Sequence, residues 1–350
     1  MPLWLYALSV FGLLALVGQF LAAPPVLVFA SACIGLIPLA GLIGHATGQL
    51  SLRLGAHWGG LLNATFGNAA ELIITILALR EGLFTLVKAS ITGSIVGNTL
   101  LVLGTALLVG GLRHGTLRFD LRMSGLSSGL MILAVAGLLL PAVFGTLVPD
   151  DTRLEELSVA VALILLLSYV AYLIFLLRGG VGSSETMSQI EEEAPEWSVR
   201  RGLFALVAAT VGTAVVSDVL VNAVTPVTEQ LGWTEFFLGI IVIPIVGNAA
   251  ENWAAVRAAW RNHVDLTLGI TSGSSTQIPL FVTPVLILVS LLIGHPMTLV
   301  FNPLELLVLA LSTAISAYIA LDGESNWLEG VLLLALYLMT ATVFFLDPTP

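Results

Sequence analysis

One five-residue stretch occurs twice in this chain, as Gly67-Asn68-Ala69-Ala70-Glu71 and as Gly247-Asn248-Ala249-Ala250-Glu251. Each copy places a glutamate inside a long apolar run. The second copy begins 180 positions after the first, and the same offset relates Gly93-Ser94 to Gly273-Ser274. A carboxylate deep in a bilayer is costly and usually has a function. Two such carboxylates at equivalent positions predict one shared site between two related halves.

The composition supports a membrane location for these glutamates. Hydrophobic residues make up 57% of the chain and charged residues 10%, and the mean hydropathy is +1.03. A soluble domain has far more charge on its surface. The net charge of −10 excludes nucleic acid as a partner. Cys33 is the only cysteine, so a disulfide framework and a cysteine metal cluster are both excluded.

A membrane-spanning helix needs about 20 mostly apolar residues. By this criterion eleven segments are predicted to be transmembrane helices. The first lacks a basic region and a small-residue cleavage site, so we expect a retained helix rather than a signal peptide. The predicted spans are residues 3–21, 26–47, 57–80, 86–111, 123–141, 155–177, 202–224, 234–258, 265–293, 303–321 and 326–346.

Basic residues predict the orientation, because cytoplasmic loops carry an excess of lysine and arginine. With a cytoplasmic N-terminus, nine of the twelve basic residues lie inside and three lie outside. We therefore predict a cytoplasmic N-terminus and an external C-terminus, in the plasma membrane of a prokaryotic cell. The inside residues are Arg53, Arg113, Arg118, Arg122, Arg178, Arg200, Arg201, Arg257 and Arg261, and the outside ones are Arg80, Lys88 and Arg153.

The duplication and the odd number of spans together predict an inverted-topology repeat. Helices two to six correspond to helices seven to eleven, and a repeated five-helix unit has to enter the membrane from the opposite side. Many secondary transporters are built in this way, with a site near the midplane between the repeats. The expected fold class is all-α, a polytopic membrane protein with about 11 transmembrane helices. Its predicted parts are an extra N-terminal helix at 1–25, a first repeat at 26–178, an acidic cytoplasmic loop at 179–200 and a second repeat at 201–350.

The acidic loop has two interpretations. A run of like charges is typical of a solvated linker. The alternative is a segment that collects cations at the cytoplasmic mouth, and the sequence leaves both open. The acidic residues concerned are Glu185, Glu191, Glu192, Glu193 and Glu196.

In each copy of the motif, the asparagine and the glutamate share one face of a helix. The preceding glycine loosens the helix and frees backbone carbonyls, which is tolerated at this depth only where they line a cavity. Carboxylate, amide and carbonyl oxygens therefore gather at each copy. The candidate ligand residues are Gly67, Asn68 and Glu71 of the first copy and Gly247, Asn248 and Glu251 of the second.

The helix after each motif carries a row of polar side chains. Ser94 and Asn98 belong to the row in the first half, and Ser274 and Gln277 to the row in the second. Small polar residues often join membrane helices by hydrogen bonds, and this is the alternative for any single one of them. Because each row follows a motif helix, we predict that both rows line an ion pathway.

Two carboxylates among neutral oxygens favour a hard divalent cation, since calcium takes about six to eight oxygen ligands in a flexible shell. The motifs hold no histidine or cysteine, so zinc and copper are poor candidates, whereas manganese stays open. Without the cation, two facing carboxylates in a low-dielectric site tend to take up protons. The predicted activity is therefore exchange of cytoplasmic calcium for external protons, with no resident cofactor and no enzymatic reaction.

Two other classes of membrane protein are alternatives to an exchanger. A cation-selective channel also uses facing glutamates, but two opposed halves are explained by alternating access. A membrane-embedded metal hydrolase is disfavoured, because the five histidines lie near predicted helix ends or in loops. The expected partners are calcium ions, protons and the lipid bilayer, and the sequence leaves a homo-oligomer open.

These motifs resemble those of the cation/proton exchanger family within the calcium/cation antiporter superfamily. The resemblance rests on residues 60–74, 93–98, 245–251 and 273–279. It implies that the two motif glutamates bind calcium and protons alternately, while the motif asparagines and the two polar rows line the path. Asn252 stands where many relatives have a histidine, and Gly48 stands where many have an acid. These two departures from the family pattern concern gating and cation preference.

Overall fold

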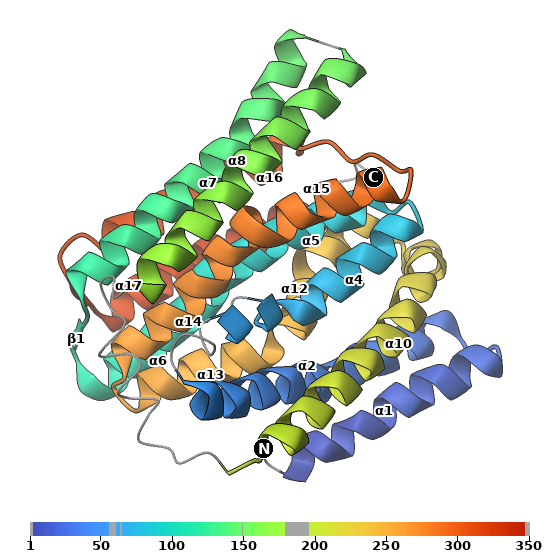
Figure 1. Cartoon of the computed structure of the whole chain (residues 1–350), viewed down its shortest axis with the longest axis horizontal. Helices are drawn as coiled ribbons and strands as arrows, with labels where there is room; N and C mark the ends of the chain where they lie inside the picture. The colour runs from blue at the N-terminus through green and yellow to red at the C-terminus, as the bar shows by residue number, and fades with distance from the viewer. Residues whose placement is uncertain (1–2, 56–60, 64, 149, 179–195, 347–350) are drawn as a thin grey trace. The chain divides into compact units, whose positions relative to one another are not determined.

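The structure is a computed structural model that describes residues 3–55, 61–63, 65–148, 150–178 and 196–346. Most of this backbone is helical (Figure 1). Within the described ranges, seven helices are long and apolar enough to cross a membrane, or eight if one bent pair counts as a span. The prediction of an all-α polytopic membrane protein is confirmed. The finer count of eleven spans stays a prediction.

The predicted acidic loop lies mostly outside the described residues. Glu185, Glu191, Glu192 and Glu193 belong to that part, whereas Glu196 is described and exposed. Both interpretations of the loop therefore remain predictions.

The described chain divides into two compact units, and each unit takes residues from both halves of the sequence. Unit 1 comprises Met1–Ser90, Met187–Glu251 and Phe344–Pro350. In it, α2 packs along α10 and against α1, and α10 also contacts α4 (Figure 1). Its helices are α1 (Leu3–Phe20), α2 (Pro25–Leu54), α4 (Ala69–Arg80), the first part of α5 (Phe84–Val96), α10 (Val199–Leu231), α11 (Glu235–Phe237), the π-helix η2 (Leu238–Val242), α12 (Ile243–Gly247) and the start of α13 (Ala249–Trp260).

Unit 2 comprises Ile91–Thr186 and Asn252–Val343. Within it, α7 packs against α8, α14 and α16. Two short strands pair antiparallel, with Leu117 opposite Ser325. Besides the remaining parts of α5 and α13, its elements are the π-helix η1 (Gly97–Val102), α6 (Leu103–His114), β1 (Leu117–Arg118), α7 (Leu121–Leu147), α8 (Asp151–Leu177), α14 (Val264–Gln277), the π-helix η3 (Ile278–Val282), α15 (Thr283–Leu292), α16 (Pro303–Ile319), β2 (Glu324–Ser325) and α17 (Trp327–Leu346) as far as Val343.

Several helices extend beyond the predicted spans. Helix α10 runs from Val199 to Leu231, whereas residues 202–224 were predicted. A hydropathy window finds only the apolar part of a helix, and the polar ends continue as helix because their backbone groups still need partners. Capping sets the true ends: the Ser198 hydroxyl accepts from the Arg201 amide, and Gly232 adopts the left-handed conformation after the last turn.

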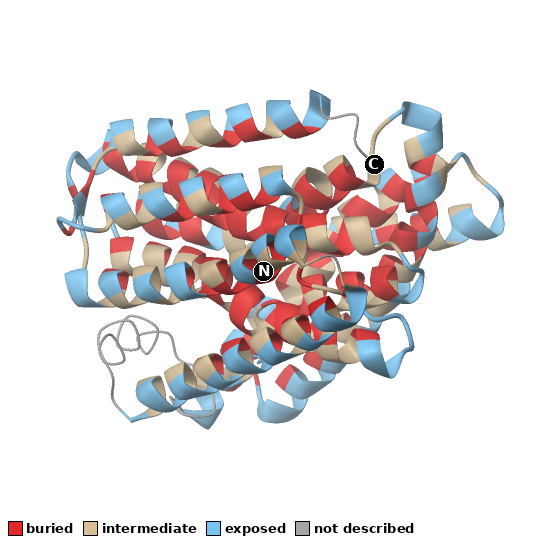
Figure 2. Ribbon diagram, turned by 90° about the horizontal axis from the view of Figure 1, so that it is seen from above, coloured by how far each residue is buried: buried red, intermediate tan, exposed pale blue. Residues whose placement is uncertain are grey.

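Buried and exposed residues alternate around single helices (Figure 2). On α7 and α8, large apolar side chains such as Leu140 and Leu167 are more than 60% exposed. An exposed apolar face of this extent marks an interaction with a partner or a membrane. In this chain the exposed apolar face is consistent with contact with lipid, in agreement with the integral membrane location.

Trp197 anchors one end of the α2–α10 pair in unit 1. Its backbone amide donates to Gln49 Oε1 at 3.0 Å, and its carbonyl accepts from Arg53 Nε at 2.9 Å. The His45 ring meets the indole edge-on at 4.8 Å, and the Arg201 guanidinium lies 4.8 Å from the indole centroid. Trp197 is buried in an apolar cluster with residues of α2, α4 and α10. Trp197 therefore links the segment that precedes α10 to helix α2.

Replacing this anchor should destabilise the protein. We expect Trp197→Ala to lower the free energy of unfolding by about 3 kcal/mol, because it removes a buried indole and leaves a cavity. Thermal unfolding in detergent would show this as a lower Tm. Trp253→Ala is the matched control, since Trp253 is 59% exposed. Equal Tm values for both variants would show that the Trp197 contacts do not stabilise unit 1.

Candidate functional site

A helix break lies at each copy of the motif. In the first copy, Gly67 and Asn68 form a turn and α4 begins at Ala69. In the second, α12 ends at Gly247, and the chain bends by 60° at Asn248 before α13 begins. The two asparagines have similar backbone angles, with φ of −104° and −94°. Both glutamates consequently lie in the first turn of a new helix.

The glutamate of the first copy lies against the glycine of the second. A Cβ atom added to Gly247 would lie 3.4 Å from both Cδ and Oε1 of Glu71. Glu251 follows Gly247 by four residues, across the bend at Asn248, and lies close enough to Glu71 for an electrostatic interaction between the two carboxyl groups. Unit 1 thus brings Glu71, Gly247 and Glu251 into one neighbourhood, although 180 residues separate the two copies.

Burial differs between the two glutamates. Glu71 is 4% exposed, whereas Glu251 is half-buried. The Glu71 Oε1 atom has no hydrogen-bond partner among the described residues. A buried carboxylate oxygen without a partner is costly in a protein. The arrangement therefore favours a bound cation or a proton at this oxygen.

The motif asparagines are also buried, Asn68 at 3% and Asn248 at 2% exposure. Each stands at the break immediately before a motif helix, where an amide oxygen can face a ligand. Gly67 is half-buried and Gly247 is buried. Thr75, one turn after Glu71, donates its hydroxyl hydrogen to the Glu71 carbonyl at 2.6 Å. This hydroxyl is therefore engaged within α4.

Three hydroxyls of unit 1 were missed by reasoning from the sequence. Thr47 on α2 and Thr213 and Ser217 on α10 are buried, and their oxygens have no hydrogen-bond partner in the described part of the chain. Both helices pack against α4, which carries Glu71. The i, i+4 spacing of Thr213 and Ser217 in an apolar helix is the signal that could have found them.

The two predicted polar rows lie in unit 2. Ser94, Asn98 and Ser274 are buried, and Gln277 is half-buried. The rows belong to neighbouring elements, since η1 packs against α14 and the hydroxyl oxygens of Thr99 and Ser275 are 3.2 Å apart. That these polar rows lie close to Glu71 and Glu251 stays a prediction.

A π-helical turn occurs at the same place in both rows. Asn98 lies in η1, where the Leu103 amide donates to the Asn98 carbonyl five residues back. Gln277 directly precedes η3, where the Thr283 amide donates to the Ile278 carbonyl. Such turns are rare and frequently mark functional sites.

The site offers two carboxylates and otherwise neutral oxygens. Among the described residues, no group of three histidine, cysteine, aspartate or glutamate side chains could hold a metal ion. A cation bound at Glu71 and Glu251 would therefore complete its shell with amide, hydroxyl and carbonyl oxygens. This ligand set suits a hard divalent cation.

Comparison with known proteins agrees with this chemistry. The family model of the sodium/calcium exchanger protein matches residues 24–178 and 201–346. The chain is 42% identical over 337 residues to the Ca(2+)/H(+) antiporter ChaA of Bacillus subtilis (strain 168), covering 95% of this chain and 96% of the relative. It is 42% identical over 360 residues to the Ca(2+)/H(+) antiporter of Aphanothece halophytica, covering 98% and 96%.

Solved structures show the same fold. Native YfkE superimposes with a TM-score of 0.86 at 38% identity, covering 98% of this chain and 99% of that chain. The H+/Ca2+ exchanger CAX gives a TM-score of 0.69 at 14% identity, covering 98% and 91%, which supports the fold alone. The chain therefore belongs to the sodium/calcium exchanger protein family, and its predicted membership of the cation/proton exchangers in the calcium/cation antiporter superfamily is confirmed.

Proposed function

We propose that this protein exchanges cytoplasmic calcium for external protons at a site built by Glu71 and Glu251. The observation that carries the proposal is the proximity of the Glu71 carboxyl group to Gly247, where an added Cβ atom would lie 3.4 Å from it. It places the acid of one motif copy against the backbone of the other. The relatives at 42% identity are named as Ca2+/H+ antiporters, which supports calcium and protons as the two ions.

The chemistry of exchange follows from two carboxylates that serve both ions. Calcium needs them ionised, so it binds best where protons are scarce. Protons that arrive from the other side neutralise the pair and weaken its hold on the metal. Since the empty pair concentrates negative charge in a poorly solvated place, one ion or the other has to occupy it. This competition couples calcium export to proton entry.

The remaining predicted ligands have supporting roles in this proposal. Asn68 and Asn248 supply amide oxygens at the helix breaks, and Gly67 and Gly247 allow close approach to the backbone. The polar rows, with Ser94 and Asn98 in one half and Ser274 and Gln277 in the other, line the path that leads ions to the glutamates.

The two halves are proposed to be an inverted repeat of five helices each, at 26–178 and 201–350, after an extra helix at 1–25. Matching local structure supports this. Helix α13 starts 180 residues after α4, α14 starts 180 after α5, and α15 starts 180 after α6. The π-helices η1 and η3 start 181 residues apart. The proposal includes eleven membrane spans and alternating access to a site near the midplane of the membrane.

A pH gradient should drive calcium transport. In inside-out vesicles with an acidic lumen, we expect calcium uptake with alkalinisation of the lumen and without sodium. Lowering the outer, cytoplasmic-side pH should reduce uptake, because protons then compete for the carboxylates on the side where calcium loads. A calcium dye outside and a pH dye inside measure both fluxes. Uptake that survives nigericin but needs sodium would contradict proton coupling.

The same vesicles separate the alternatives. Manganese in place of calcium tests for exchange of another divalent cation. A cation-selective channel would instead give large currents that need no proton gradient. Two Glu-bearing motifs in one chain favour the exchanger over the channel.

The orientation is testable with single cysteines. In a Cys33→Ala background, Glu196→Cys and His295→Cys place exposed thiols in loops that we propose to lie inside and outside, respectively. An impermeant maleimide added to intact cells should label only the cysteine at position 295, and lysis should expose the other. Labelling of both from outside would overturn a cytoplasmic N-terminus with eleven spans.

A further inference from the structure

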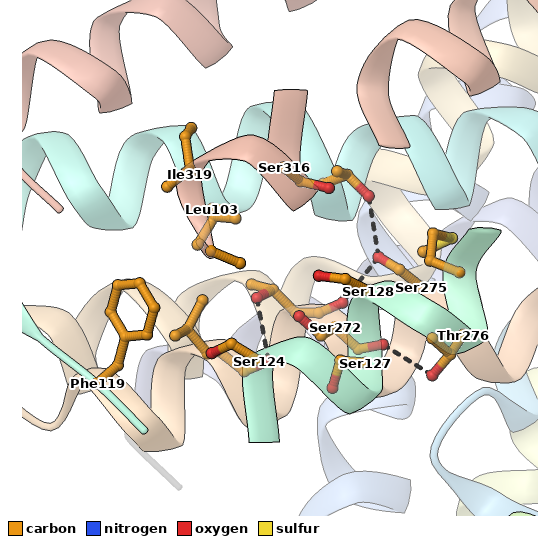
Figure 3. Close-up of a pocket in the computed structure, with 15 residues that line it drawn as sticks. Leu103, Phe119, Ser124, Ser127, Ser128, Ser272, Ser275, Thr276, Ser316 and Ile319 are labelled. Carbon is orange, nitrogen blue, oxygen red and sulfur yellow. Dashed lines mark hydrogen bonds between the residues drawn. The ribbon is translucent and has the colours of Figure 1, made fainter. Parts of the chain in front are cut away.

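Unit 2 contains a small cavity that the calcium site does not use. Its volume is about 40 Å³, and its walls come from η1, α6, α7, α14 and α16. Figure 3 shows Ser127 and Ser128 of α7 facing Ser272, Ser275 and Thr276 of α14. Nine of the fifteen lining residues are serines or threonines, and none is charged.

The absence of charge in this lining decides which ligands fit. Calcium binding in proteins relies on carboxylates among its oxygen ligands, and the lining has none. An anion would need positively charged or strong donor groups. A small, uncharged, hydroxyl-lined cavity suits water, since a buried water needs two to four polar partners. One water takes roughly 10–15 Å³ of such space, so the cavity has room for about three.

The hydroxyl hydrogens of the deepest residues point away from the cavity. Thr99 donates to the Ile95 carbonyl at 2.7 Å, and Ser275 donates to the Thr271 carbonyl at 2.7 Å. Thr271 and Thr276 likewise donate to the carbonyls four residues back, at 3.0 and 2.8 Å. With their hydrogens used, these oxygens can only accept inside the cavity. Four of the nine hydroxyl groups in the lining therefore offer acceptor oxygens to the cavity, which favour a ligand with hydrogens to donate.

A protonated water is such a ligand, because it donates three hydrogen bonds and carries a positive charge. Thr99 directly follows Asn98, and Ser275 directly follows Ser274. The cavity is thus lined by residues of the same two segments that carry the predicted polar rows. In Figure 3, Phe119, next to β1, and Ile319 of α16 lie at the end of the cavity away from Ser275 and Thr276. The proposed orientation puts that end on the cytoplasmic side.

We propose that this cavity is a hydration site that takes protons, but not calcium, between the cytoplasmic end of unit 2 and the Thr99–Ser275 pair. The proton part of the inference rests on the proposed calcium/proton exchange. The hydration part does not, so the two can fail separately.

Hydration is tested by radiolytic hydroxyl-radical labelling of the full chain in nanodiscs. Met131 lines the cavity and is 5% exposed, while Met297 is 3% exposed and lies outside the lining. Trapped water should oxidise Met131 strongly and Met297 weakly. The cavity-filling variant Ser128→Leu should remove this difference, and Ser128→Ala should keep it. Equal, low oxidation of both methionines in the unmodified protein would show a dry cavity and overturn the proposal.

Proton transfer is tested with Thr99→Val and Ser275→Ala, which remove acceptors with little change in volume. We expect each to slow gradient-driven calcium uptake by about fivefold, the effect of losing roughly one net hydrogen bond to the excess proton. The solvent deuterium isotope effect should rise, while the calcium KM stays unchanged. Thr105→Val is the control, since Thr105 also donates within its helix but lies outside the lining.

Each other result has a definite meaning. A changed calcium KM would place the cavity on the metal path, and unchanged uptake in both variants would leave only structural water, so either overturns the proton route. If the unmodified protein moves calcium without protons, the proposed function fails, whereas labelling of Met131 would still report the hydrated cavity.

Discussion

Glu71→Gln and Glu251→Gln should each abolish proton-driven calcium uptake, because each removes a charge and a titrating group from the site. A unit charge and a divalent ion about 4 Å apart attract by about 8 kcal/mol at an effective dielectric constant of about 20. Even if desolvation offsets most of this, a remainder of about 3 kcal/mol weakens calcium binding by about a hundredfold. Uptake in proteoliposomes, with isothermal titration of calcium, measures both effects.

The control for this pair is Glu229→Gln. Glu229 is exposed near the end of α10, so its neutralisation should have a much smaller effect. The two motif variants should be similar in severity, because both carboxylates hold the same ion in the proposed site. A Glu251 variant with near-normal transport would show that Glu71 acts alone and that the shared site is wrong.

Gly247→Val should also eliminate transport, although it removes no charge. A methyl group at this position would lie 3.4 Å from the Glu71 carboxyl, which is ordinary contact, so Gly247→Ala can fold. The added methyl group nevertheless lies beside the Glu71 carboxyl, where the proposed calcium ion and its other oxygen ligands have to fit. We expect Gly247→Ala to slow uptake about tenfold, equivalent to about 1.4 kcal/mol, and the bulkier valine to block it.

Gly44→Ala in α2 separates this effect from a general response to losing a glycine. Gly44 is exposed, and no described atom lies within 4 Å of an added Cβ. Alanine is also the better helix former by about 1 kcal/mol. Uptake should be unchanged and Tm equal or higher. If Gly247→Ala transports as well as Gly44→Ala does, the contact with Glu71 has no role in exchange.

The duplication is the reason why the sequence singles out the two glutamates as site residues, which stays a prediction. A single glutamate in an apolar run is ambiguous, but two copies with the same neighbours mark positions that both halves need. The glycine that opens each motif also indicated a helix break, and a break is present at both copies. The contact of Glu71 with Gly247 could not be predicted, because it depends on how α4 and α12 pack in unit 1.

Other features depend on long-range contacts or on backbone details without a sequence signal. The backbone of Trp197 forms hydrogen bonds with Gln49 and Arg53, which lie 148 and 144 positions away along the chain. No residue near Trp197 in the sequence indicates either partner. A π-helical turn changes hydrogen bonding by one residue, which no residue type encodes. The cavity between α7 and α14 likewise depends on packing, although its serines and threonines are visible in the sequence.

The division of each unit between the two halves of the chain limits what either half can do alone. Unit 1 takes residues before Ile91 and again from Met187 to Glu251, and unit 2 takes the stretches that follow each of these. A fragment cut between the halves would carry an incomplete portion of both units. Two fragments should therefore regain a native fold only when they are produced together, as complementing partners.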